Sequence, residues 1–123
     1  MEFSIELYET NSGRSVVEDE LEDLEKQSPE LHALVVVGLS KLRSRENHRP
    51  PLCLPIGAGL FELRVGHRNI ARALWFFRHG RRIIVVRCFV KKSQRTPASE
   101  LELAKHRMTD YLGREKPSMW QRG

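Results

Sequence analysis

The sequence predicts a small α+β domain: a strand, two helices, three antiparallel strands and a last helix, with the helices packed on one sheet. Its length of 123 residues fits a single hydrophobic core. Apolar runs such as residues 83–86 need such a core, which excludes a disordered chain. Strand-like and helix-like periodicities follow one another along the chain and give the order of the elements.

The first part of the chain predicts one strand and a helical hairpin. Residues 2–8 alternate polar and apolar side chains, as a half-buried strand does. Ser15 and Glu18 have the spacing of a capping box, and an apolar helical stripe follows at Val17, Leu21 and Leu24. Ser28 and Pro29 begin a second helix. Its expected inner face is Leu31, Leu34, Val35, Gly38 and Leu42.

The rest of the chain predicts three strands and a helix. Residues 44–59 are rich in Pro and Gly, which predicts a connecting loop. Strand-like runs follow at 60–65, 70–78 and 82–90, with His79-Gly80 as a two-residue hairpin turn between the last two. Thr96-Pro97 starts a helix that ends near Gly113. We expect one domain over 1–113 and a mobile tail over 114–123.

Charge is distributed unevenly along the chain. Residues 1–40 carry ten acids and two bases, whereas residues 41–97 carry fourteen bases and two acids. A basic block of this kind indicates a polyanionic partner such as nucleic acid. The alternative is a solvated basic face that only keeps the protein soluble.

Several function classes are not supported by the sequence. No segment is long and apolar enough to span a membrane and no signal peptide is recognisable, so we expect a cytoplasmic protein without a membrane partner. Cys53 and Cys88 have no metal-like spacing, which predicts reduced thiols and no metal site. No cofactor-binding motif is present, because Gly57-Ala58-Gly59 lacks the lysine and helix of a phosphate loop.

The expected hairpin register places like charges opposite each other. A two-residue turn pairs Arg72 with Arg87 and Arg68 with Lys91, and His67 borders this face. Such pairs destabilise a sheet unless an anion compensates them, and a phosphate backbone would. Alternatively, the arginines extend outward to water. On this register, replacing Arg72 should leave the fold intact or stabilise it.

Three segments resemble a known family. They are Phe61-Glu62-Leu63-Arg64, Arg72 early in an apolar strand, and the run from Phe89 to Pro97 that opens a helix. Together they resemble the phage-derived HigB-like branch of the RelE/ParE toxin superfamily, over about residues 2–112.

The resemblance implies a RelE-like fold and a toxin of a type II toxin–antitoxin system. Toxins of the RelE and HigB types cut mRNA in the ribosomal A site. A cognate antitoxin neutralises them. For this chain we expect a HigA-like helix-turn-helix antitoxin, and we expect the toxin to bind operator DNA only through it. By motif, the catalytic residues are expected to be Arg64, Arg72, Lys91 and Lys92. The expected RNA-binding residues are His67, Arg68, Arg87 and Arg95.

The implied chemistry is attack of an RNA 2′-hydroxyl on the adjacent phosphate, with arginines stabilising the negative charge. Lys91 or Lys92 accepts the proton, or both lysines only anchor phosphate. Two other functions remain open: a ParE-like toxin that binds DNA gyrase, and a non-enzymatic nucleic-acid-binding co-repressor. We expect the antitoxin to contact the acidic hairpin, about residues 15–43, or the adjacent sheet edge. Alternatively, the acids of the hairpin merely keep the helix soluble.

Overall fold

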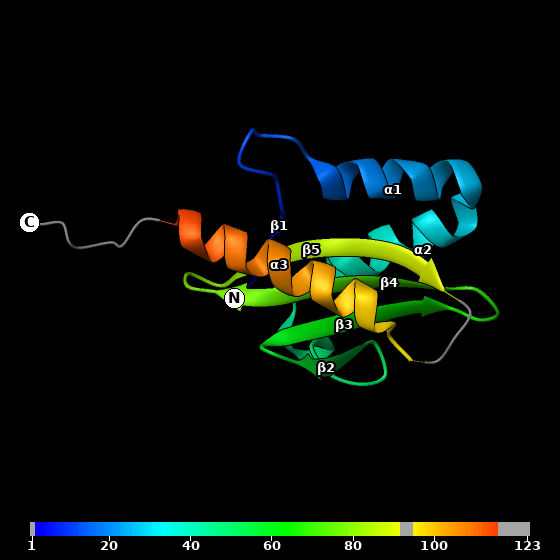
Figure 1. Cartoon of the computed structure of the whole chain (residues 1–123). Coiled ribbons are helices and arrows are strands. Elements are labelled where there is room, and N and C mark those ends of the chain that lie inside the picture. Colours follow the sequence, from blue (N-terminus) through cyan, green and yellow to red (C-terminus); the bar gives the residue numbers. More distant parts are fainter. Residues whose placement is uncertain (1, 92–94, 116–123) are drawn as a thin grey trace, which may run out of the picture.

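A five-stranded mixed sheet forms the centre of the computed structural model, which describes residues 2–91 and 95–115 (Figure 1). The predicted α+β class is confirmed, and the predicted elements occur in the expected order. Along the chain the elements are β1 (Ser4–Leu7), α1 (Val16–Gln27), α2 (Pro29–Lys41), the short 3₁₀ helix η1 (Arg45–Asn47), β2 (Cys53–Gly57), β3 (Leu60–Gly66), β4 (Ile70–Arg78), β5 (Arg82–Lys91) and α3 (Ala98–Arg114).

The strands lie in the order β1-β5-β4-β3-β2. β1 runs parallel to β5 and all other neighbours are antiparallel. β2 corrects the prediction of a loop over 44–59. It is an edge strand with an irregularity between Pro55 and Gly57, which is where a sheet tolerates proline. The Pro and Gly content therefore concealed a strand that is only half-buried.

The helices cover both faces of the sheet. Adjacent residues of a strand point to opposite faces, so Glu62 and Leu63 of β3 mark the two sides. Gly38 of α2 packs on Leu63: a Cβ placed there would lie 3.1 Å from the leucine Cδ1. Leu101 of α3 lines a hollow together with Glu62 on the other side. Figure 1 shows α3 crossing the face opposite α2.

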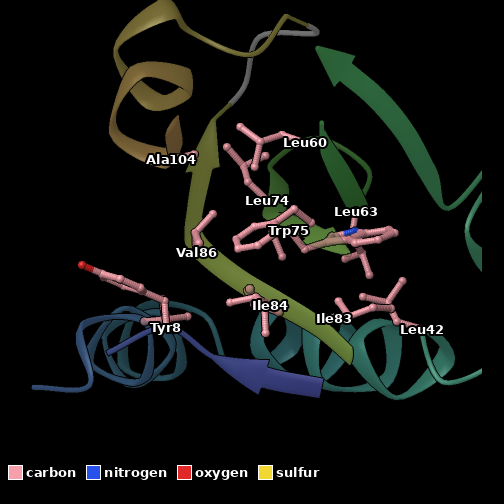
Figure 2. Close-up of a cluster of buried hydrophobic side chains, with 14 of the residues drawn as sticks. Tyr8, Leu42, Leu60, Leu63, Leu74, Trp75, Ile83, Ile84, Val86 and Ala104 are labelled. Carbon is pink, nitrogen blue, oxygen red and sulfur yellow. The ribbon is translucent and has the colours of Figure 1, made fainter. Parts of the chain in front are cut away.

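The core lies on both sides of β4 and β5 (Figure 2). Trp75 of β4 and Ile84 of β5 are fully buried, as are Val17 of α1 and Leu42 after α2. The expected place of Leu34 on the inner face of α2 is wrong, because this side chain is 44% exposed. Val35, Gly38 and Leu42 are buried against the sheet, Leu31 and Leu39 pack beside them, and Leu34 lies outside this contact.

Two of the three predicted helix caps differ from expectation. Ser28 caps α2 as predicted, since its hydroxyl oxygen accepts from the Leu31 backbone N–H at 3.3 Å. Ser15 makes no such bond and donates to Glu9 at 3.2 Å. The N-cap of α3 is Pro97 rather than Thr96, whose hydroxyl donates to Glu62. Tertiary partners thus replace two of the local caps.

The predicted hairpin register is wrong by two residues. Arg78 pairs with Arg82, so the turn between β4 and β5 has three residues and not two. Gly80 (φ +76°) and Arg81 (φ +57°) take the left-handed conformations that this turn requires. A bulge between Leu74 and Trp75 adds a second shift. Arg72 consequently lies opposite Phe89, Arg87 opposite Leu74 and Lys91 opposite Ile70.

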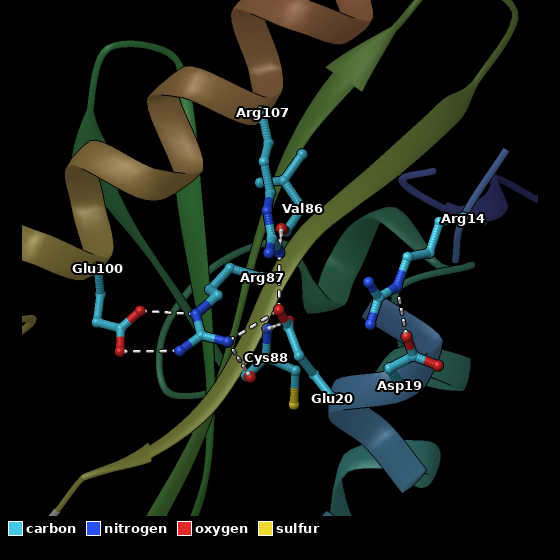
Figure 3. Close-up of polar contacts among 8 residues, drawn as sticks. All are labelled: Arg14, Asp19, Glu20, Val86, Arg87, Cys88, Glu100 and Arg107. Carbon is cyan, nitrogen blue, oxygen red and sulfur yellow. Dashed lines mark hydrogen bonds and ion pairs between the residues drawn. The ribbon is translucent and has the colours of Figure 1, made fainter. Parts of the chain in front are cut away.

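Side chains complete the edge of β5 beyond the end of β1 (Figure 3). β1 pairs with β5 only as far as Val85. Further along, the Cys88 N–H donates to the Glu20 carboxylate of α1 at 2.9 Å. Arg107 of α3 donates to the Val86 carbonyl at 2.8 Å. These contacts satisfy an edge that would otherwise be open to pairing.

The end of α3 is fixed to the β4–β5 hairpin. Glu115 pairs with Arg78 and, at 2.8 Å, with Arg82. Of the predicted tail, Arg114 is the last helical residue and Glu115 makes these pairs, while residues 116–123 lie outside the described residues.

Candidate functional site

A buried carboxylate lies at the centre of the candidate site. Glu62 of β3 and Arg72 of β4 are both 0% exposed. Arg64 Nε donates to Glu62 Oε1 at 2.5 Å, and Arg72 Nη1 lies 3.6 Å from Glu62 Oε2. Thr96 donates its hydroxyl hydrogen to the same carboxylate and accepts from Arg72 at 3.5 Å. We name Glu62, Arg64, Arg72 and Thr96 the Glu62 cluster.

Strand geometry builds this cluster. Glu62 and Arg64 are two residues apart on β3 and share a face. Arg64 is paired directly with Arg72 of β4, so two arginines do oppose each other across the sheet. The Glu62 carboxylate compensates them, as a buried charge requires. Burial lowers the pKa of Arg72, the Glu62 charge counteracts this, and the Arg64 charge adds to the lowering.

The Glu62 cluster opens into a surface hollow of about 490 Å³, which we name the Arg95 hollow. Glu62, Arg64, Arg95 and Thr96 line it together with Leu54, Pro55, Ile56 and Leu101. The Arg64 side chain is 26% exposed and Arg95 is exposed, so both can meet a ligand from solvent. Arg64 on a strand and Arg95 between β5 and α3 can both donate to an anionic ligand such as phosphate.

Arg87 has a different environment from the predicted one (Figure 3). Its guanidinium donates to the Glu100 carboxylate at 2.6 and 3.1 Å and lies 2.9 Å from Glu20. Burial lowers the pKa of Arg87, but these two carboxylates together raise it above its ordinary value. The expectation that Arg87 opposes Arg72 and needs an external anion is therefore wrong, since acids of α1 and α3 compensate it.

Three other predicted residues, Lys91, His67 and Arg68, do not line the Arg95 hollow. Lys91 is exposed at the end of β5 and lines a separate hollow of about 300 Å³ with Arg87 and Glu100. His67 and Arg68 are exposed in the turn between β3 and β4, and the expected pairing of Arg68 with Lys91 is wrong. Lys92 lies outside the described residues.

Sequence reasoning overlooked Glu62 and Thr96 as parts of the site. Both stand inside the segments that carry the family resemblance. The available signal was an acid two residues before an arginine on a buried strand, because such an acid shares a face with the arginine. Thr96 offered only an N-cap signal, and its tertiary partner is invisible in the sequence.

The described residues hold no group of three or more His, Cys, Asp or Glu side chains suited to a metal ion. Cys53 and Cys88 are free and buried. Burial raises the pKa of the Cys53 thiol to about 11, and burial with the nearby Glu20 raises that of Cys88 to about 12. None of the helices that the structure describes is long and apolar enough to cross a membrane.

A family model matches residues 22–109, which include β2 to β5, α2 and the whole Glu62 cluster. Its description is phage-derived protein Gp49-like (DUF891), a toxin-like family of the RelE/ParE type. No curated protein matches the chain. Because the match spans well over half of the sequence, the protein belongs to the Gp49-like family of phage-derived proteins.

Proposed function

We propose that this protein is the toxin of a type II toxin–antitoxin pair and inhibits translation by cutting mRNA on the ribosome. The toxin-like family supports the first part. The observation that carries the second is the Glu62 cluster, a preorganised arginine pair beside a hollow where Arg64 and Arg95 reach solvent. Fixed cations aimed at developing negative charge are a main source of catalytic rate.

In the proposed reaction the RNA 2′-hydroxyl attacks the adjacent phosphorus. A cyclic phosphate forms, the bond to the 5′ oxygen breaks, and that oxygen takes up a proton. Arg64 and Arg95 bind the phosphate and stabilise its added charge. Arg72 is buried, so we assign it a positioning role: it holds Glu62, which in turn orients Arg64. Lys91 and Lys92 either accept the 2′-hydroxyl proton or anchor a neighbouring phosphate.

The proposed partners follow from the family resemblance. They are the ribosome with its mRNA and a helix-turn-helix antitoxin of the HigA type, with operator DNA bound only through the antitoxin. We propose a cytoplasmic location, because the ribosome and its mRNA are found there. The ribosome would supply part of the substrate orientation, which suits a site built of cations.

Toe-printing of an mRNA on ribosomes tests the proposal. The wild type should create new ends in the A-site codon only when ribosomes are present. Arg64→Ala should reduce this cleavage about 100-fold, the typical effect of losing one charge-stabilising donor. Arg14→Ala is the matched control, because that side chain is 72% exposed at the start of α1 and should have no effect.

Two results would contradict the proposal. One is a folded Arg64→Ala variant that cuts as well as the wild type. The other is a wild type that arrests growth and inhibits DNA gyrase supercoiling while mRNA stays intact, since that behaviour belongs to a ParE-like toxin.

A further inference from the structure

We propose that a second hollow next to Arg64 is an RNA subsite. It binds a nucleotide that flanks the two nucleotides whose linkage is cut. This inference rests on the proposed function. The second hollow has a volume of about 320 Å³, and we name it the Arg49 hollow. Its principal lining residues are Lys41, Arg49, Arg64, Pro50, Pro51 and Leu52.

The two hollows share Arg64 as a common wall. Arg64 lines the Arg49 hollow and also the Arg95 hollow, where it belongs to the Glu62 cluster. The backbone connects them too, since the Arg64 N–H donates to the Leu52 carbonyl at 3.0 Å. A ligand with repeating phosphates can occupy both sites past one shared cation. A small single anion would occupy only one of the two hollows.

The lining of the Arg49 hollow suits a nucleotide. Lys41, Arg49 and Arg64 are opposed by one acid, Glu46, so cations prevail. The prolines and Leu52 add apolar surface on which a base can lie. Sites for single-stranded nucleic acid combine cations that follow the backbone with aromatic side chains on which bases stack, and here the prolines and Leu52 offer apolar surface in place of aromatic rings. The volume also falls in the range of roughly 300–1,000 Å³ typical of ligand sites.

The Arg49 hollow is already formed in the free protein. Asn47 Nδ2 donates to the Lys41 carbonyl at 3.0 Å, and the His48 ring lies 2.6 Å from the Leu42 carbonyl. These bonds tie the segment after α2 back onto the end of that helix. The Cys53 N–H donates to the Arg49 carbonyl at 3.1 Å, which ties Arg49, in the segment before β2, to the first residue of that strand.

Aromatic packing holds this wall in place. The His48 ring is 4.8 Å from the Phe3 ring, 5.3 Å from Phe77 and 5.5 Å from Trp75, between ring centroids. A hollow supported in this way loses little entropy when it binds a ligand. The backbone that carries Arg49 therefore needs little rearrangement to bind RNA.

Binding of RNAs of two lengths tests the subsite without ribosomes. The probes are fluorescent 2′-O-methyl oligonucleotides, which resist cleavage: a dinucleoside monophosphate and an unstructured strand of about ten nucleotides. Arg49→Ala and Lys41→Ala should each weaken the longer strand about three- to tenfold at about 50 mM salt. Each should also lower the salt slope by about 0.7. The short probe should bind as it does to the wild type.

Arg43→Ala is the matched control, because Arg43 is an exposed base beside Lys41 that lines neither hollow. An equal loss in this variant, or an equal loss with both probes, would overturn the subsite. These measurements do not involve cleavage. A length-dependent loss with no ribosomal cleavage would therefore support the subsite and reject the nuclease, whereas cleavage without a length effect would do the reverse.

Discussion

At the scale of single residues, Glu62 and Arg72 form a fully buried ion pair. We predict that Arg72→Met lowers the free energy of unfolding by about 3 kcal/mol, because it leaves the Glu62 carboxylate buried with one cation fewer. The expectation from the sequence that losing Arg72 would leave the fold intact or stabilise it rested on repulsion from Arg87, which the structure places opposite Leu74 instead. Urea unfolding monitored by tryptophan fluorescence measures the difference.

The double variant Glu62→Gln/Arg72→Met is the control for this prediction. Removing both charges should recover part of the loss, since the buried carboxylate is gone and the Arg64 side chain, which is 26% exposed, can be hydrated. If Arg72→Met unfolds at the same urea concentration as the wild type, the pair does not stabilise the fold. Because its loss should destabilise the fold, Arg72 is a poor position for a functional test. Arg64, whose side chain is partly exposed, is a better position.

At the scale of elements, Glu115 joins the end of α3 to the β4–β5 hairpin. Hydrogen bonds from Arg82 and then Arg78 hold its pKa below the ordinary value of 4.5. A carboxyl with a lowered folded pKa stabilises the fold above its unfolded pKa, and the contribution is lost as the pH falls through the folded value. Glu115→Gln should therefore cost about 1 kcal/mol at neutral pH and nothing in strong acid.

Thermal unfolding of Glu115→Gln between neutral and acidic pH checks this prediction. Glu102→Gln is a matched control on the same helix, because Glu102 is 71% exposed and pairs only locally with Lys105. A Glu115 effect that persists below the folded pKa would show that the variant acts by packing and not by charge.

The elements also show what a sequence can and cannot predict here. Hydrophobic patterning located β4 as a continuous apolar run, which is buried from Ile70 to Phe76, and located α1, α2 and α3 by their helical spacing. The patterning gave no information on the bulge at Leu74 or on the third residue of the β4–β5 turn. Each of these shifts the strand register, and together they move Arg87 away from the position opposite Arg72. The motifs located Arg64 and Arg72, but their link through Glu62 depends on the Arg64–Arg72 register of β3 and β4.

At the scale of the whole molecule, acids predominate in the first 40 residues and bases in residues 41–97. The outer acids of α1 belong to a hairpin that also exposes Leu34, Val36 and Val37 of α2. The Glu62 cluster and both hollows beside it are built mainly from residues after position 40. A partner attracted to the acidic hairpin would therefore not compete with RNA for the same side chains.

Glu20 must be distinguished from the other acids of the hairpin. It caps the β5 edge and pairs with Arg87 and Arg107, so it is part of the scaffold. Glu18, Glu22 and Glu25 are exposed and can be reversed in charge without breaking that network.

We predict that the triple variant Glu18→Lys/Glu22→Lys/Glu25→Lys retains ribosomal cleavage. It should associate with its antitoxin about tenfold more slowly at low salt, because the long-range attraction to a basic antitoxin patch is lost. Stopped-flow association at several salt concentrations, with growth rescue in co-expressing cells, measures this. The difference from the wild type should shrink as salt screens the charges. If association and rescue are unchanged at every salt concentration, these acids serve solubility and the antitoxin binds elsewhere on the toxin.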